Sequence, residues 1–436
     1  MNFNVTRAIT ILSAHVLLPI MGFAAATPVV ADPAEPELIE LKVNAGPGSA
    51  GPNLTRGPER TLVLSWQEPQ DDKTLLRFSR LTGAGWSAPR TIAAGENWFV
   101  NWADFPSVLA VSDKLWAAHW LSKRPGGIYS YAVSLALSSD GGESWSNAIT
   151  PHDDNTATEH GFVSLYPAAA GVGVVWLDGR NTLASDDEMA HSGEHAQKHG
   201  KGDMTLRHAS FTADGAISEE IELDDRVCDC CQTSVAMARQ GPVVVYRNRT
   251  EEEIRDIYIT RFVDGEWLAG QTVHEDGWKV TGCPVNGPAV AAHGDTVAVA
   301  WFTMADDIPR VRFARSEDGG ASFGAVVEVS EHSPLGRVDL ALLDNGTAVV
   351  SWLDQLPGGS GEFLLRTIAG DGRPAAPFSV TRMQTGRPSG FPQMHSDGND
   401  LILAWTEGSA TNGGKSSSVV KSARIAWPAA AFTTSN

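Results

Sequence analysis

The chain has 436 residues and a formal net charge of −19 at pH 7, with 14 Trp and 43 Gly. So acidic a protein repels phosphate backbones and anionic lipid headgroups, which excludes nucleic acid and bacterial membrane surfaces as favoured partners. Many Trp and Gly and few helix-favouring stretches suit short, tightly turned strands, so we expect an all-β fold.

Residues 1–26 predict a secretory signal peptide. A lone Arg7 precedes an apolar run at 8–23, and three alanines follow at 24–26. The run is too short to span a bilayer, which takes about 20 apolar residues, and it contains His15. We therefore expect cleavage after the alanines, a periplasmic or secreted location, and no membrane insertion after processing.

Residues 48–430 contain a repeat in which a run of small and apolar residues ends in an aromatic residue. Units of 51 to 56 residues, with one of 70, each with several short strands and turns, are typical of radially stacked four-stranded sheets. We predict a β-propeller of four-stranded blades, seven by repeat count, with six as the alternative. The repeated aromatic residues are Trp66, Trp120, Trp176, Tyr246, Trp301, Trp352 and Trp405.

Two of the turns expected between third and fourth strands carry a longer motif, at 138–145 and 316–323. Both read Ser-x-Asp-Gly-Gly-x-Ser followed by an aromatic residue. This resembles the Asp box, or BNR repeat, of the sialidase superfamily, in which the carboxylate accepts turn amide protons and the aromatic ring packs between sheets. The resemblance implies a sialidase-like propeller, here an exported bacterial member, and a structural role for the motif.

The chain departs from sialidases where their catalysis is concerned. The resemblance implies an Arg cluster, an Asp acid/base and a Tyr nucleophile late in the propeller. Here Arg56 and Arg60 do not lie in the family's sequence context, no Tyr follows Tyr258, and seven repeats replace six blades. We therefore do not expect a typical sialidase.

The sharpest local signal is a group of cysteines before two predicted inner strands. In propellers, the loops that enter innermost strands share one face with the loops that leave second strands, so adjacent blades would bring these cysteines together at the channel mouth. In an exported protein, four Cys are most simply two disulfides. The alternative is a thiolate site for copper or zinc, and a redox-active disulfide is also open. The candidate metal ligands are Cys228, Cys230, Cys231 and Cys283, with His160 beside them.

Charged residues on the same face allow another function, a glycoside hydrolase of exo-sialidase type. Carboxylates would serve as acid and base, and an Arg cluster would hold an anionic sugar. Solvated or ion-paired surface charge is the simpler interpretation. The candidate catalytic residues are Asp104, Asp178 and Asp256, and the candidate ligand-binding residues are Arg180, Arg247, Arg249, Arg337 and Arg387.

Three further segments complete the organisation. The insertion at 181–203 is rich in His and acidic residues, which suits a solvated loop or an accessory metal-capture segment. Residues 27–47 form a linker and a strand that would pair with 418–427, close the ring and remove a sheet edge. Residues 431–436 are expected to be a disordered tail. We expect a monomer that takes a small-molecule, glycan or metal ligand.

Overall fold

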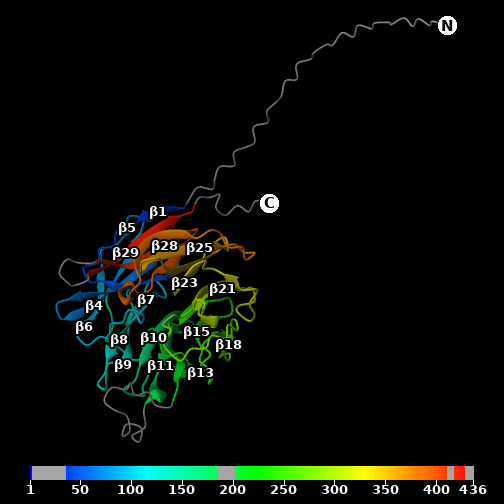
Figure 1. Cartoon of the computed structure of the whole chain (residues 1–436). Helices are drawn as coiled ribbons and strands as arrows, with labels where there is room; N and C mark the ends of the chain where they lie inside the picture. Colours follow the sequence, from blue (N-terminus) through cyan, green and yellow to red (C-terminus); the bar gives the residue numbers. More distant parts are fainter. Residues whose placement is uncertain (2–35, 184–201, 410–416, 428–436) are drawn as a thin grey trace. The chain divides into compact units, whose positions relative to one another are not determined.

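The computed structural model describes Met1 and residues 36–183, 202–409 and 417–427. The predicted signal peptide, most of the His-rich insertion and the predicted tail lie outside the described residues. The described chain is all-β, and seven antiparallel sheets stand as blades in a ring (Figure 1). The predicted seven-bladed propeller is therefore confirmed. No helix in the described part of the chain is long and apolar enough to cross a membrane.

The first four blades follow one another along the chain. Blade 1 has β2 (Ala50–Arg56), β3 (Leu62–Gln70), β4 (Lys73–Thr82), β5 (Gly85–Trp86) and β6 (Arg90–Gly95), and the last two both pair with β4. Blade 2 has β7 (Ser107–Ala110), β8 (Trp116–Lys123) and β9 (Tyr131–Ser138). An isolated β-bridge joins Leu135 of β9 to Ile149 at the outer edge of blade 2. Blade 3 has β10 (His160–Ala168), β11 (Gly171–Asp178), β12 (Met204–Thr212) and β13 (Ile221–Val227); blade 4 has β14 (Ser234–Met237), β15 (Pro242–Arg247), β16 (Ile257–Val263), and β17 (Glu266–Trp267) and β18 (Gln271–Thr272) both on β16.

The remaining blades repeat this order. Blade 5 has β19 (Ala289–His293), β20 (Thr296–Thr303), β21 (Arg310–Ser316) and β22 (Val327–Glu328); blade 6 has β23 (Pro334–Leu342), β24 (Ala348–Gln355), β25 (Ser360–Ile368) and β26 (Phe378–Gln384); blade 7 has β27 (Gln393–Asp397), β28 (Asp400–Ser409), β29 (Ser417–Ala426) and β1 (Glu37–Glu40). Short 3-10 turns lie at η1 (Pro58–Arg60), η2 (Arg180–Thr182), η3 (Ala305–Asp307) and η4 (Arg387–Ser389).

The N-terminal strand closes the ring as predicted. β1 pairs antiparallel with β29, from Glu37 opposite Ala426 to Glu40 opposite Ala423. Figure 1 shows the blue start of the propeller against its red end. The seventh blade therefore takes its outermost strand from the other end of the chain, which covers an edge that would otherwise be open.

The repeated aromatic residues form the core between blades. All seven lie on second strands, and Trp66, Trp176, Trp301 and Trp352 are fully buried. In three blades the indole N–H also donates to a carboxylate two residues further on, which satisfies a polar group inside the core. These pairs are Trp66 with Glu68 at 3.0 Å, Trp176 with Asp178 at 2.8 Å and Trp352 with Asp354 at 2.9 Å.

Both Asp-box turns have the same hydrogen bonds. Ser138 Oγ accepts from the Gly142 amide at 2.8 Å, and Asp140 Oδ1 accepts from the Ser144 amide at 2.9 Å. In the second copy, Ser316 and Asp318 accept from Gly320 and Ser322 at the same distances. These turns lie at the ends of the third strands, on the face opposite the loops that enter the inner strands. The motif thus stabilises a hairpin away from any site at the other mouth.

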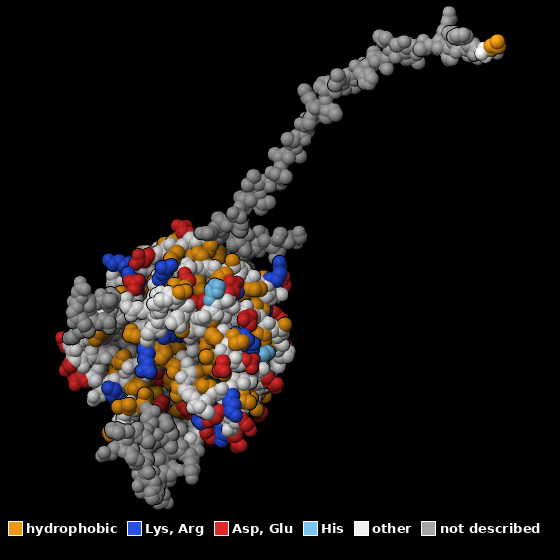
Figure 2. Space-filling model, viewed as in Figure 1, with side chains coloured by type: hydrophobic (Ala, Val, Ile, Leu, Met, Phe, Trp, Pro, Cys, Tyr) orange, Lys and Arg blue, Asp and Glu red, His pale blue; other side chains and the backbone are white. Residues whose placement is uncertain are grey.

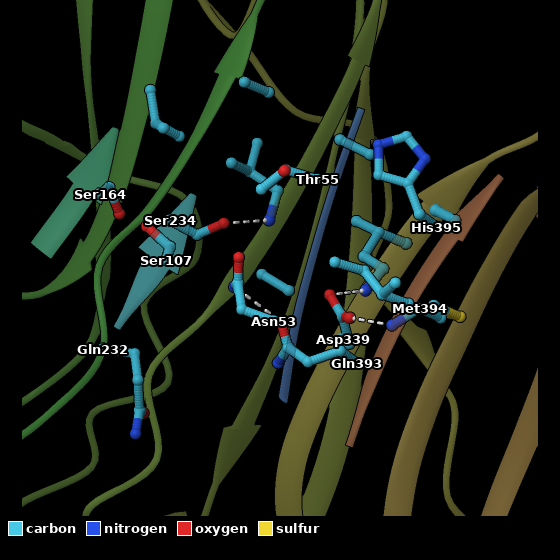
Figure 3. Close-up of a pocket in the computed structure, with 18 of the residues that line it drawn as sticks. Asn53, Thr55, Ser107, Ser164, Gln232, Ser234, Asp339, Gln393, Met394 and His395 are labelled. Atoms are coloured by element: carbon cyan, nitrogen blue, oxygen red, sulfur yellow. Dashed lines mark hydrogen bonds between the residues drawn. The ribbon is translucent and has the colours of Figure 1, made fainter. Parts of the chain in front are cut away.

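The seven inner strands line a central cavity of about 680 Å³. Its wall is polar where Asn53 Nδ2 donates to Gln393 Oε1 at 3.2 Å, and where Asp339 accepts from the Met394 amide at 2.6 Å (Figure 3). Asp104 and Gln232 also border the cavity, towards the face of the propeller that carries the cysteines. We call this face the upper face.

Candidate functional site

Two loops bring the four cysteines together on the upper face. Cys228, Cys230 and Cys231 lie between β13 and β14, and Cys283 lies between β18 and β19. The Sγ atoms of Cys228 and Cys231 are 3.3 Å apart, and the three clustered sulfurs all lie within 4.8 Å of one another. Cys283 comes from the loop before the next blade. We call these four residues the thiol cluster.

Close packing of the two loops holds the thiol cluster together. The Cys228 amide donates to the Arg247 carbonyl at 2.9 Å, which fixes the first loop to the end of β15. The Gly287 amide donates to Gln232 Oε1 at 2.9 Å. A Cβ at Gly287 would lie only 2.2 Å from the Gln232 carbonyl oxygen, so only glycine allows this approach.

All four cysteines are free in the structure. Neither of the two disulfides considered from the sequence is formed, and the disulfide interpretation gains no support. The side chains differ in access, because Cys228 and Cys231 are buried, Cys230 is half-buried and Cys283 is exposed. The thiol cluster therefore has a closed inner end and an open outer end.

A buried cation lies against the inner end. Arg255 is 2% exposed, and its Nη1 donates to Cys228 Sγ at 3.3 Å. Burial raises the pKa of the Cys228 thiol, but hydrogen bonds with Cys230 and Cys231 and the charge of Arg255 outweigh it and hold this pKa well below the usual value. The thiol cluster is thus arranged to hold at least one thiolate, which is the form that binds metals.

A second buried guanidinium strengthens this electrostatic preference. Arg247 is 2% exposed and donates to the backbone carbonyls of Arg255, Asn286 and Phe302. Burial raises the pKa of the Cys231 thiol, and the positive charge of Arg247 offsets part of that increase. Two buried guanidiniums beside buried thiols favour negative charge on sulfur.

His160 does not join the thiol cluster. It lies in a second group with His152, Asp154 and Asp178, where its Nε2 is 3.1 Å from Asp154 Oδ1 and 3.6 Å from Asp178 Oδ1. Hydrogen bonding to Asp154 and the charge of Asp178 outweigh burial and raise the pKa of His160. The prediction of His160 as a ligand beside the cysteines gains no support from its position, because its ring lies between the carboxylates of Asp154 and Asp178.

The second group does not have the geometry of a metal site. The rings of His152 and His160 stack with centroids 3.9 Å apart and planes only 6° from parallel. An imidazole nitrogen binds a metal in the plane of its ring, and two parallel planes at this spacing cannot both contain one ion. Arg180 also lies 3.6 Å from Asp154 and 2.8 Å from Asp178, so a guanidinium already supplies the positive charge.

The three candidate catalytic carboxylates make separate hydrogen bonds in different parts of the propeller. Asp104 Oδ1 accepts from the Phe162 amide at 2.8 Å, and burial raises its pKa to about 7. Asp178 is bonded to Trp176 and Arg180, and Asp256 accepts from the Gly277 and Trp278 amides. Each therefore stabilises a loop or a core side chain, and no contact among the described residues joins two of them as an acid/base pair.

The five candidate arginines do not converge on a ligand. Arg337 is buried and donates to carbonyls of 385–390, and Arg180 and Arg249 are held in ion pairs. Arg247 is enclosed by backbone carbonyls, and Arg387 is exposed on η4. Figure 2 shows cations and acidic groups interspersed over one face. The structure thus assigns four of these arginines to the scaffold.

Sequence reasoning gave Glu159 and Arg255 no specific role. Burial, with the nearby charges of Asp229, Asp104 and Cys283, raises the pKa of Glu159 to about 8. The Glu159 carboxyl group thus lies close enough to Cys283, at the open end of the thiol cluster, to be affected by its charge. Glu159 also accepts from the Tyr131 hydroxyl at 3.4 Å. The one available signal was position, because Glu159 precedes an inner strand as the cysteines do.

Strained backbone occurs where the inner strands meet the upper face. Phe162 and Arg337 have φ of 52° and 55° at bulges in β10 and β23, and Val285, two residues after Cys283, has φ of 48°. A β-branched residue in this region is a genuine outlier. The amides of Phe162 and Arg337 are held by Asp104 and by an Asn286 side chain.

Comparisons with known proteins address the fold. No protein-family model matches the chain, and no curated protein matches it. An ulvan lyase of a new polysaccharide lyase family is 9% identical with a TM-score of 0.51, over 84% of this chain and 93% of that chain. NanB sialidase from Streptococcus pneumoniae is 7% identical, with a TM-score of 0.43 over 89% and 94%.

A sialidase from Trypanosoma rangeli is 13% identical, with a TM-score of 0.44 over 78% of this chain and 56% of that chain. At such identities the likeness is one of fold. The chain is a seven-bladed β-propeller with two Asp-box turns, and its chemistry has to be argued from its own residues.

Proposed function

We propose that this protein binds a thiophilic metal ion, Cu(I) or Zn(II), through the thiol cluster at the mouth of its propeller. The observation that carries the proposal is the convergence of three free thiols, whose sulfurs all lie within 4.8 Å of one another, with buried Arg255 bonded to one of them. Thiolates are the preferred ligands of Cu(I), and four of them form a common structural site for Zn(II).

The surroundings suit such an ion. Its ligands would be Cys228, Cys230 and Cys231, completed by Cys283 from the next blade. A bound metal would replace thiol protons and so be favoured where cations already stabilise thiolates, as Arg255 and Arg247 do. The location we propose is the periplasm or the exterior of the cell, on the basis of residues 1–26. Within the described part of the chain, the three carboxylates of the glycoside hydrolase alternative are engaged in the scaffold, which disfavours that alternative.

Metal titration of the reduced, metal-free protein tests the proposal. Competition with a chromogenic chelator for Zn(II), and separately for Cu(I), should give near-stoichiometric binding that is lost in Cys228→Ser and Cys230→Ser. His160→Gln is the matched control, since it removes a buried ligand-type residue of the second group and should leave binding unchanged. Wild-type protein that competes for neither metal would refute the proposal.

A further inference from the structure

Residues 101–105 close the upper end of the central cavity. This loop lies between β6 and β7, before the inner strand of blade 2, and it contacts residues of several other blades. The contacts are Phe105 beside Gly51 in blade 1, Asp104 bonded to Phe162 in blade 3, Ala103 bonded to Gln232 before blade 4, and Trp102 against Arg337 in blade 6 and Phe391 before blade 7. Ala103 and Asp104, which border the cavity, are 2% and 3% exposed. The cavity is therefore closed towards the upper face.

The cavity opens on the opposite face, which carries the Asp-box turns and which we call the lower face. Arg60 and Asp344 border the cavity there, and their side chains are 50% and 48% exposed. Their guanidinium and carboxylate form an ion pair of 2.8 Å between the loops that follow β2 and β23. Exposed residues at this end and buried residues at the other make the cavity a blind pocket. A small solute therefore enters it from the lower face.

Arg56 has free hydrogen-bond donors just inside this opening. It is the last residue of β2 and lines the cavity. Its Nε and Nη2 atoms are buried and have no hydrogen-bond partner among the described residues. The two carboxylates whose charges act on it are held by other arginines, Asp344 by Arg60 and Asp397 by Arg424 at 3.1 Å. Because buried donors are almost always bonded, Arg56 lacks an acceptor that the described chain does not supply.

The two free donors form one edge of the guanidinium group. Nε–H and the adjacent Nη2–H point in the same direction, and such an edge binds both oxygens of one carboxylate. Arg180 uses the same two atoms to bind Asp178, with both distances 2.8 Å. Among the described arginines, Arg56 alone has both atoms buried and unbonded. A carboxylate is therefore the acceptor that matches Arg56 best.

The wall of the cavity beyond Arg56 is polar and suits hydroxyl groups. Several inner strands contribute polar side chains, and Figure 3 labels Asn53, Ser107, Ser164, Ser234, Asp339 and Gln393 among them. Asn53 Oδ1 is buried and has no partner among the described residues, so it can accept from a hydroxyl. Asn53 and Arg56 lie on the same strand, about 10 Å apart along it. The volume of about 680 Å³ is in the usual range for a small-molecule site, about 300–1,000 Å³.

The acidic residues of the cavity oppose an anion only weakly. Asp339 accepts from the Leu340 and Met394 amides, and burial raises its pKa to about 7. Burial also raises the pKa of Asp104 to about 7, and Asp104 lies at the closed end. Both carboxyl groups are thus partly protonated at neutral pH, and Asp344 at the opening is already paired with Arg60.

We propose that the central cavity is a second binding site, which takes a small hydroxylated carboxylate from the lower face. The carboxylate binds the Nε and Nη2 edge of Arg56, and a hydroxyl of the same molecule donates to Asn53 Oδ1. The site shares no residue with the thiol cluster and lies towards the other face of the propeller. It goes beyond the proposed metal binding and does not depend on it.

Ligand-observed NMR titration of the full-length protein tests the site with three probes. Gluconate carries a carboxylate and several hydroxyls, sorbitol is its neutral counterpart, and inorganic phosphate is an anion of another shape. Wild type should bind gluconate and should bind sorbitol and phosphate at least about tenfold more weakly. Arg56→Gln should weaken gluconate binding at least about tenfold, and Arg56→Lys should lie between Arg56→Gln and wild type, because it keeps the charge and loses the planar edge.

Arg239→Gln is the matched control. Arg239 is an exposed arginine after β14 that pairs with Asp295 at 2.7 Å, so its loss makes the same change of charge without changing the cavity wall. Its affinity for gluconate should equal that of wild type. Cys228→Ser should also bind gluconate like wild type, which separates this site from the thiol cluster. Circular dichroism of each variant establishes that it is folded.

The outcomes of the titration are distinct. Gluconate binding that is weakened by Arg56→Gln and unchanged by Arg239→Gln supports the site. Wild type that does not bind gluconate, or an equal affinity in wild type and Arg56→Gln, would overturn it. Equal binding of sorbitol and gluconate, or binding of phosphate without gluconate, would overturn the assignment of a carboxylate. Loss of gluconate binding with intact metal binding, or the reverse, refutes one proposal and leaves the other standing.

Discussion

Substitution of Arg255 tests whether a buried cation prepares the thiol cluster for metal. Arg255→Gln removes the charged donor 3.3 Å from Cys228 Sγ. A hydrogen bond to a charged group contributes about 1.5–3 kcal/mol, which corresponds to about 10- to 150-fold in affinity at about 1.4 kcal/mol per factor of ten. We therefore expect Zn(II) and Cu(I) affinity at neutral pH to fall by that factor, measured by chelator competition.

The effect should depend on pH in a defined direction. Loss of the cation raises the pKa of Cys228 towards its usual value, so more protons must be displaced by the metal at low pH. The gap between wild type and Arg255→Gln should widen as pH falls from 8 to 6. Arg255→Lys, which keeps the charge, should lie between them.

Arg249→Gln is the matched control for Arg255→Gln. Arg249 also pairs with Glu253, at 2.6 Å, and with Asp229, but its contacts are with carboxylates and not with sulfur. Its substitution should change affinity by less than about threefold, as expected for a partly exposed ion pair. Equal losses in the two Gln variants, or no loss in either, would show that Arg255 does not stabilise the thiolate.

The remaining predictions concern the scaffold. Trp352→Phe removes the indole donor to Asp354 and should lower the free energy of unfolding in urea by about 1–3 kcal/mol. Trp405→Phe should lower it less, because the Trp405 indole N–H has no hydrogen-bond partner among the described residues. Equal losses in the two variants would contradict this reasoning. Hydrogen bonds from Ser322 and Ser316 lower the pKa of Asp318 to about 2, so its stabilisation is present above about pH 4 and lost as pH falls towards 2; Asp318→Asn should flatten that part of the acid unfolding profile. Deletion of 36–46 should lower the melting temperature by several degrees, and an unchanged value would refute ring closure by β1.

The fold could be predicted because its signals are local and repeated. Seven aromatic residues at near-constant spacing indicated the blade count, and the apolar alternation at 38–43 pointed to the strand that completes the ring. Each of these depends on side-chain spacing along one strand, which the sequence contains directly.

The thiol cluster was predictable in outline, because loops before adjacent inner strands must lie side by side. Its partners were not. Arg255 reaches Cys228 only because its loop bends back to bond the Trp278 carbonyl, and His160 turns to Asp154 instead of the cysteines. Such choices depend on long-range packing and on burial, which raises or lowers pKa in ways that a residue's position in the sequence does not reveal.

The pairing of β1 with β29 has a consequence for biosynthesis. During synthesis β1 is made first, and its partner β29 is made last of the blade strands. The seventh blade therefore cannot assemble until β29 has been made. Until then the edge of β28 that pairs with β29 has unpaired backbone N–H and C=O groups, and the ring is open. A nascent or truncated chain that ends before Ser417 should therefore be the form most prone to aggregation and proteolysis.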